Sequence, residues 1–324
     1  MRKYPLILKP VFKDYIWGGD RLAREWGKAP SSGIIAESWE LSLRRDALTV
    51  VANGEFEGRT LDGVLDSNED FAGKKSRAFA VFPMLIKLID SRQNLSVQVH
   101  PSDAYALKKE NSYGKSEVWF ILDAQEGAGI YFGFKKDVDK REILDRIADG
   151  SLTDVLNFLP VSKGDAYMIE AGTVHAIGAG ITLAEIQQNS DLTYRVYDFG
   201  RVGKDGKPRE LHIDKALDVM NTKALNAAKS PFAYVEYASF EKRLIADNKY
   251  FFVEHYRLKD YCRILNRECF SALTVTEGAV DIIYRAAGVR EAYVGAAKGA
   301  TVFIPAGLDV TVSGKGAEFI SATL

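Results

Sequence analysis

The chain has 324 residues, of which 47% are hydrophobic and 27% are charged, and its formal net charge is −1. This length allows about two domains, each with its own core. The near-neutral net charge does not favour binding to nucleic acid or to an anionic membrane. No stretch approaches the roughly 20 apolar residues of a membrane span. The apolar run before Lys9 is too short for the core of a signal peptide, and Cys262 and Cys269 form neither a disulfide framework nor a paired zinc motif. We therefore expect a cytoplasmic protein that binds a small molecule and has neither a nucleic-acid nor a membrane partner.

Short alternating or apolar segments separated by glycine turns predict β-strands through most of the chain. In chain order, the clearest predicted strands cover residues 36–42, 80–90, 95–100, 117–122, much of 168–199, and nearly everything beyond about residue 231. Helical spacing of apolar residues predicts a short helix at 102–109, two short helices around Gly150-Ser151 within 137–159, and another helix at 215–221. The pattern indicates a mainly β fold with short helical insertions.

The segment Leu95-Ser96-Val97-Gln98-Val99-His100-Pro101 has an unusual polar face. Because alternate side chains of a strand point to opposite faces, Gln98 and His100 stand on the same side. Pro101 cannot donate a ladder hydrogen bond and is expected to end the strand, which leaves the histidine at a rim. The pair is a candidate half of a metal site, and the alternative is a polar strand face that meets solvent.

An internal repeat indicates a duplicated architecture. Residues 163–172 (KGDAYMIEAG) align with residues 298–307 (KGATVFIPAG), and each copy follows a strand that ends in Glu-Gly. Two related β-units of this kind predict two jelly rolls. The residue three positions past the last glycine is His175 in the first copy and Val310 in the second, so only the first unit would keep a site. We expect a unit at 1–235 that carries the site and a degenerate unit at 236–324.

Four residues at strand ends or after turns form a candidate constellation: Gln98, His100, Glu117 and His175. Two imidazoles, a carboxylate and an amide oxygen suit a borderline divalent ion, with zinc as the first choice and iron, manganese or cobalt as alternatives. Each residue could also have a role other than metal binding, since a lone histidine is often structural and a lone glutamate is often an exposed charge on a strand.

At this point the residues resemble type I mannose-6-phosphate isomerase, in its short bacterial form. The resemblance runs from about residue 10 to residue 221 and rests on the segments FPMLIK (82–87), LSVQVHP (95–101), KSE (115–117), GTVHA (172–176) and YRVYD (194–198). It implies the cupin jelly roll, one zinc ion per chain on Gln98, His100, Glu117 and His175, and a sugar phosphate as substrate. It also implies that Arg195 is the active-site arginine and that Lys115 and Glu185 line the same pocket. The implied reaction interconverts mannose 6-phosphate and fructose 6-phosphate through an enediol or enediolate.

Alternatives remain open at this stage. Glu185 could form a structural ion pair, for example with Arg195; Arg195 could hold the barrel rim; and Lys115 could be solvated. Two other functions fit a cupin, namely a non-haem iron oxygenase and a non-catalytic sugar-binding protein. His212 and His255 are expected to be structural. The sequence also leaves the oligomeric state open between a monomer and a weak homodimer.

Overall fold

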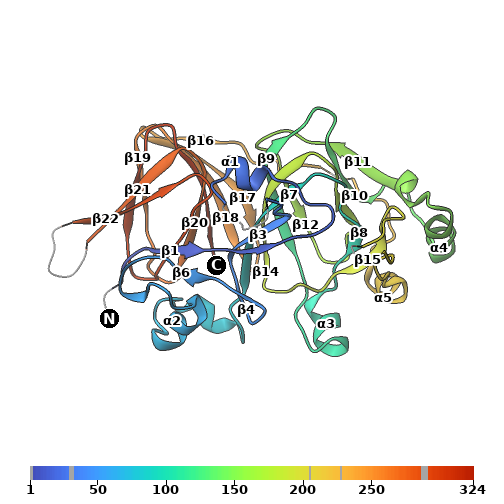
Figure 1. Ribbon diagram of the computed structural model, residues 1–324, viewed down its shortest axis with the longest axis horizontal. Helices are drawn as coiled ribbons and strands as arrows, with labels where there is room; N and C mark the ends of the chain where they lie inside the picture. The colour runs from blue at the N-terminus through green and yellow to red at the C-terminus, as the bar shows by residue number, and fades with distance from the viewer. Residues whose placement is uncertain (1–2, 29–32, 204–205, 227, 286–290) are drawn as a thin grey trace.

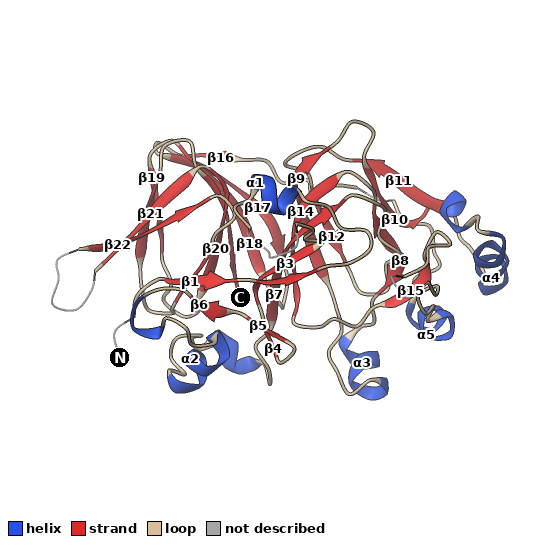
Figure 2. Ribbon diagram, in the orientation of Figure 1, coloured by secondary structure: helices blue, strands red, loops and turns tan. Residues whose placement is uncertain are grey.

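A computed structural model of the protein describes residues 3–28, 33–203, 206–226, 228–285 and 291–324. Antiparallel sheets are the main regular structure of the molecule, and Figure 2 shows α2, α3, α4 and α5 at its outer edges. Among the described residues, no helix is long and apolar enough to cross a membrane. The expected mainly β fold is confirmed.

The first jelly roll, on the right of Figure 1, consists of two sheets. The larger sheet has the order β12-β9-β14-β7-β3-β2, and the smaller has the order β11-β10-β13-β8-β15. The strands of the larger sheet are β2 (Val11–Lys13), β3 (Glu37–Leu41), β7 (Met84–Ser91), β9 (Glu117–Ala124), β12 (Ala166–Ile169) and β14 (Ile181–Gln188). Those of the smaller sheet are β8 (Val97–Val99), β10 (Gly129–Phe134), β11 (Leu156–Pro160), β13 (His175–Ile177) and β15 (Tyr194–Tyr197).

The second jelly roll repeats this arrangement. Its larger sheet has the order β16-β17-β18-β25-β20-β23-β1-β6, and its smaller sheet has the order β19-β24-β21-β22. The strands of the larger sheet are β1 (Leu6–Lys9), β6 (Val50–Val51), β16 (Val235–Glu236), β17 (Phe240–Asp247), β18 (Phe252–Leu258), β20 (Ser271–Glu277), β23 (Thr301–Ile304) and β25 (Glu318–Thr323). Those of the smaller sheet are β19 (Tyr261–Ile264), β21 (Ala279–Tyr284), β22 (Ala292–Ala297) and β24 (Val310–Ser313). A separate two-stranded hairpin joins β4 (Leu43–Arg44) to β5 (Ala47–Leu48).

The internal repeat of the sequence corresponds to equivalent strands of the two units. The neighbours β12-β9-β14-β7 of the first unit match β23-β20-β25-β18 of the second, and β11-β10-β13-β8 match β22-β21-β24-β19. His175 pairs with Gln98 and Phe132, whereas Val310 pairs with Ile264 and Tyr284 at the matching place in the second unit. The predicted duplication of jelly rolls is therefore confirmed. The division of the chain near residue 235 stays a prediction, and the N-terminal strands β1 and β6 belong to the larger sheet of the second unit.

The helices are short and follow local signals. They are α1 (Arg21–Glu25), α2 (Leu61–Ser67), α3 (Asp103–Lys109), α4 (Lys140–Asp149) and α5 (Ile213–Val219), with 3-10 turns at η1 (Gly54–Phe56), η2 (Lys75–Ala78) and η3 (Leu152–Val155). Asp139 caps α4 by accepting a hydrogen bond from the backbone of Glu142, and Gly150 ends the helix at a φ of 81°, which favours glycine. The second helix expected within 137–159 is shorter than its apolar spacing suggests: it is η3, and residues 156–159 belong to strand β11.

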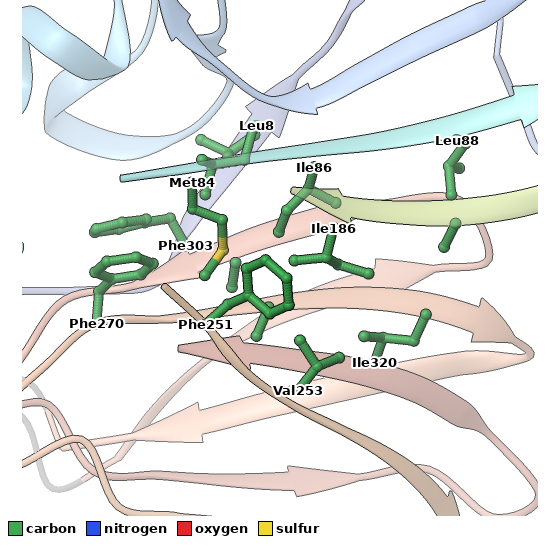
Figure 3. Close-up of a cluster of buried hydrophobic side chains, with 14 of the residues drawn as sticks. Leu8, Met84, Ile86, Leu88, Ile186, Phe251, Val253, Phe270, Phe303 and Ile320 are labelled. Carbon is green, nitrogen blue, oxygen red and sulfur yellow. The ribbon is translucent and has the colours of Figure 1, made fainter. Parts of the chain in front are cut away.

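The two units share one hydrophobic core. Apolar side chains of the larger sheet of the first unit, such as Ile86 and Ile186, pack in the same cluster as Phe251, Phe303 and Ile320 of the second unit (Figure 3). Phe251 is fully buried in this cluster. Because burial of an aromatic side chain contributes several kcal/mol, the shared core joins the two jelly rolls into one body.

A buried ion pair crosses the same junction. The ammonium group of Lys28 lies 2.6 Å from a carboxylate oxygen of Glu40 on β3 and donates to the carbonyl of Gly299, at 2.6 Å. The hydroxyl of Thr301 on β23 donates to the other carboxylate oxygen of Glu40, at 3.2 Å. One face of β3 is thereby tied to the second unit, which leaves its other face for the interior of the first.

We expect the Phe251→Ala variant to lose about 3–5 kcal/mol in free energy of unfolding, because it opens a cavity in the shared core. Chemical denaturation measures the loss. The control is Phe232→Ala, since Phe232 is 45% exposed and its removal is expected to change stability by no more than about 0.5 kcal/mol. Equal and small losses for both variants would contradict a shared core.

Candidate metal centre and pocket

The strand pairing brings the four predicted ligands together from three separate segments. Gln98 on β8 lies directly opposite His175 on β13, and His100 follows the end of β8. Glu117 begins β9 in the facing sheet. The ligand atoms that His100, Glu117 and His175 offer all lie within 4.8 Å of one another.

The hydrogen bonds of the two imidazoles orient them toward Glu117. The Nδ1 of His100 is 2.8 Å from the carbonyl of Leu192, and the Nδ1 of His175 is 2.8 Å from the carbonyl of Thr173. Each Nδ1–H can donate to its carbonyl, which leaves each Nε2 with a free lone pair. Both Nε2 atoms lie 3.5 Å from Glu117, one from each carboxylate oxygen.

Burial leaves these groups without the partners they need. His100, Glu117 and His175 are at most 1% exposed, so their surroundings are neither a solvated strand face nor an exposed charge. Within the described part of the chain, the Nε2 of His100 and the Oε1 of Glu117 have no hydrogen-bond partner. Buried polar atoms of native proteins are almost always paired. A divalent cation between the imidazoles and the carboxylate would satisfy both atoms, so the donor set fits a metal ion.

Gln98 can complete such a site. Its side-chain amide nitrogen lies 3.4 Å from the Nε2 of His175. Since a turn of the amide exchanges its nitrogen and oxygen, the oxygen can face the same point.

The protonation preferences agree with a cation site. Burial lowers the pKa of His175 to about 4 and that of His100 well below its usual value, in the second case helped by the charge of Lys115. Both imidazoles are therefore neutral, as ligands must be. Burial, and then the charge of Glu185, raise the pKa of Glu117, so a cation is what would keep this carboxylate ionised.

The predicted pocket residues line one cavity of about 320 Å³ beside the candidate ligands. Gln98, Lys115, Glu185 and Arg195 all line it. Lys115 is only 4% exposed, so the alternative of a solvated lysine is wrong. Its ammonium group lies 2.8 Å from Glu117 and 3.6 Å from Glu185.

Glu185 on β14 pairs with lysines. Its carboxylate lies 3.2 Å from the ammonium group of Lys87 and accepts a hydrogen bond from the indole nitrogen of Trp119, at 3.1 Å. Burial opposes ionisation of Glu185, but the ammonium groups of Lys115 and Lys87 outweigh it and lower the pKa of this carboxyl. Its ion-pair partners are thus Lys87 and Lys115 rather than Arg195.

Arg195 on β15 lies directly opposite Gln98, so Arg195, Gln98 and His175 occupy neighbouring positions across β15, β8 and β13. One terminal nitrogen of Arg195 donates to the carbonyl of Glu210, at 2.8 Å. The Nε of Arg195 is buried and has no hydrogen-bond partner among the described residues. A guanidinium with a free donor at a pocket wall can bind an anionic group.

Several further residues that line the pocket were not singled out from the sequence as site residues, among them Glu37, Lys87 and Arg209. A signal existed for Lys87, because it alone interrupts the apolar run at 80–89, and a lysine in a buried strand needs a partner. Arg209 sits in an irregular segment, where no periodicity marks it. His212 and His255, expected to be structural, lie outside the cluster: His212 precedes α5, and His255, on β18 of the second unit, contacts the hydroxyl of Tyr234.

Comparison with known proteins gives consistent matches. The family model "Phosphomannose isomerase type I, catalytic domain" matches residues 6–120. The chain is 36% identical over 275 residues to the mannose-6-phosphate isomerase of Streptococcus mutans, which covers 85% of each chain. It is also 36% identical over 282 residues to the mannose-6-phosphate isomerase ManA of Bacillus subtilis, with 86% of this chain and 87% of that protein covered. The crystal structure of the mannose 6-phosphate isomerase from Bacillus subtilis matches 99% of each chain, with a TM-score of 0.88 and 29% identity.

We expect His100→Ala and His175→Ala each to weaken zinc binding by more than the roughly 100-fold that loss of a supporting hydrogen bond costs, because each removes a ligand. Elemental analysis and calorimetric zinc titration measure the change, and circular dichroism checks that the β-rich fold persists. His212→Asn is the matched control, since it alters a histidine outside the cluster. Full zinc content in either alanine variant would remove that histidine from the ligand set.

Proposed function

The chain belongs to the type I mannose-6-phosphate isomerase family, and from this premise we propose that it interconverts mannose 6-phosphate and fructose 6-phosphate by proton transfer through an enediol or enediolate. We propose one zinc ion per chain, held by Gln98, His100, Glu117 and His175. The observation that carries the metal assignment is the set of buried and unpartnered ligand atoms of His100 and Glu117. In this proposal the unit at 1–235, apart from β1 and β6, which pair in the sheet of the second jelly roll, carries the reaction, and the unit at 236–324 carries no metal.

The reaction moves a proton between C2 and C1 and develops negative charge on the sugar oxygens. When bound, a divalent ion would supply Lewis-acid stabilisation of that charge. The protein itself supplies a carboxylate and an ammonium group on the pocket wall, where Glu185 and Lys115 lie 3.6 Å apart. We assign the proton transfer to the group formed by Glu185, Lys115 and Arg195, and such positioned groups typically contribute about a hundred- to ten-thousand-fold in rate.

The charge of the pocket also favours this assignment. With Glu117 ionised, as it would be beside a cation, Glu37, Glu185 and Glu117 alternate with Lys87 and Lys115, so this row of buried groups carries one net negative charge. A divalent ion would reverse that sign and make the pocket attractive to an enediolate and a phosphate.

Arg195 and Arg209 both line the cavity, and we assign the phosphate of the substrate to this side. Arg209 is already held by Asp198, through hydrogen bonds of 2.8 and 2.5 Å. Arg195 keeps a free Nε donor, so it is the side chain with unused capacity for a phosphate oxygen. We also propose a cytoplasmic location, because a charged sugar phosphate does not cross a lipid bilayer unaided.

The direct test is a coupled assay of the purified protein on mannose 6-phosphate before and after chelation, with elemental analysis of the metal. We expect turnover that chelation abolishes and zinc restores. Metal and sugar-phosphate binding without turnover would favour the non-catalytic cupin instead. Bound iron with oxygen consumption would favour the oxygenase.

We expect Arg195→Ala to lower kcat/KM about 100-fold, since it removes a charged donor to the substrate, and to leave the metal content unchanged. Steady-state kinetics and elemental analysis measure the two effects. Arg257→Ala, which changes an arginine of the second unit, serves as the control. Unchanged kinetics in Arg195→Ala would exclude Arg195 from the mechanism.

A further inference from the structure

Lys87 is a lysine inside a sheet. It lies on β7 and is only 5% exposed. Its ammonium group lies between two carboxylates, 3.4 Å from Glu37 and 3.2 Å from Glu185. A buried ammonium ion is tolerated only when opposite charges surround it, so these carboxylates are what allow Lys87 to be there.

The strand register aligns the groups around Lys87. Trp39 on β3 lies opposite Lys87, and Lys87 lies opposite Glu185 on β14. Glu37 stands on the same face of β3 as Trp39, two residues away. Glu37, Trp39, Lys87 and Glu185 all line the cavity.

Trp39 holds Glu37 in place. Its indole nitrogen donates to a carboxylate oxygen of Glu37, at 2.7 Å, and this same oxygen faces Lys87. The ammonium group of Lys87 also lies 5.0 Å from the centre of the Trp39 ring. The carboxylate therefore has both a fixed position and a fixed partner.

The charges that face Lys87 come from three directions. Glu37 faces it from β3, Glu185 from β14, and Glu117 from β9, while the cation Lys115 lies beyond Glu185. Burial lowers the pKa of Lys87, but the three carboxylates outweigh it and raise the pKa above its usual value. Burial and the charge of Glu37 also raise the pKa of the neighbouring Tyr15 to about 12, which leaves this hydroxyl neutral. Lys13, which also lines the cavity, lies over the Trp39 ring, with its ammonium group 4.7 Å from the ring centre.

We propose that Glu37 is a positioning residue, which holds Lys87 as an ammonium ion against Glu185 and so keeps Glu185 ionised and oriented toward the pocket. The inference rests on the proposed function, in which Glu185 belongs to the proton-transfer group. Glu37 acts through Lys87, because among the described residues its carboxylate contacts Lys87 and Trp39 and not Glu185.

The test variant is Glu37→Gln, which keeps the size of the side chain and removes its charge. We expect kcat to fall about 10- to 100-fold, within the range of general acid–base contributions, while KM changes less than about threefold. Since loss of a nearby negative charge disfavours the ammonium form, we expect the alkaline limb of the kcat profile to move to lower pH. Zinc content should not change, because Glu37 is not a ligand.

Glu40→Gln is the matched control on the same strand. Glu40 is also fully buried and ion-paired, but it faces Lys28 and the second unit. We expect Glu40→Gln to lower stability and to leave kcat and its pH profile unchanged. Trp39→Phe removes the indole donor but keeps the ring beside Lys87, so it should shift kcat and the alkaline limb in the same direction as Glu37→Gln, by a smaller amount.

An activity-independent measurement separates this inference from the proposed function. NMR titration of the Lys87 ammonium group in selectively ¹⁵N-labelled holoenzyme should give a lower pKa in Glu37→Gln than in the native protein.

If the native enzyme turns over mannose 6-phosphate and Glu37→Gln has the same kcat and alkaline limb, the inference fails while the proposed function stands. The inference is also overturned if the loss of kcat is fully explained by the fraction of unfolded or metal-free protein. It is likewise overturned if kcat falls but the alkaline limb of its pH profile does not move. If the native enzyme shows no turnover, the proposed function fails, and an unchanged Lys87 pKa then overturns the inference as well.

Discussion

The site depends on burial of ionised side chains that compensate one another. From β3 to β9, the sequence of contacts is Glu37, Lys87, Glu185, Lys115 and Glu117, with successive distances of 3.4, 3.2, 3.6 and 2.8 Å. Each member is at most 8% exposed. Removing one charge from such a row leaves its neighbour uncompensated, which costs far more than loss of a surface ion pair. The row ends at Glu117, which lies beside two neutral imidazoles. A cation bound there would stabilise the charge of this carboxylate.

The architecture explains how these charges come to be buried. The charged row crosses the inner face of the larger sheet of the first unit, and the opposite face of that sheet packs on the second unit through the shared apolar core (Figure 3). Strand β3 shows the division, because Glu37 and Trp39 face the pocket while Ser38 and Glu40 face the junction. The second jelly roll thus has a physical role: it covers the back of the sheet that carries the charged row.

Much of this arrangement could be predicted from the sequence, because it follows local rules. Strand alternation placed Gln98 and His100 on one face, and the repeat of 163–172 in 298–307 predicted two related units, with His175 replaced by Val310. The convergence of the four ligands was predicted only by combining these patterns with a family resemblance. Their roles stay predictions, whereas the proximity of His100, Glu117 and His175, with Gln98 beside His175, is a feature of the structure.

What could not be predicted depends on contacts between distant segments. The partners of Glu185 were open because no local pattern says that β7 and β14 are neighbours; that pairing puts Lys87 beside it. The importance of Glu37 could not be predicted either, because it depends on the pairing of β3 with β7. Likewise, the apolar spacing at 156–159 fitted a helix, yet pairing with β10 made these residues a strand. Tertiary contacts overrode local periodicity there.

The most direct test of the central claim is an anomalous difference map from crystals of the zinc-loaded protein, collected at the zinc absorption edge. The account predicts one strong peak per chain, about 2.0–2.2 Å from the Nε2 atoms of His100 and His175 and from a carboxylate oxygen of Glu117, with Gln98 facing it. A map with no peak among these side chains, or with its peak elsewhere on the chain, would contradict the account.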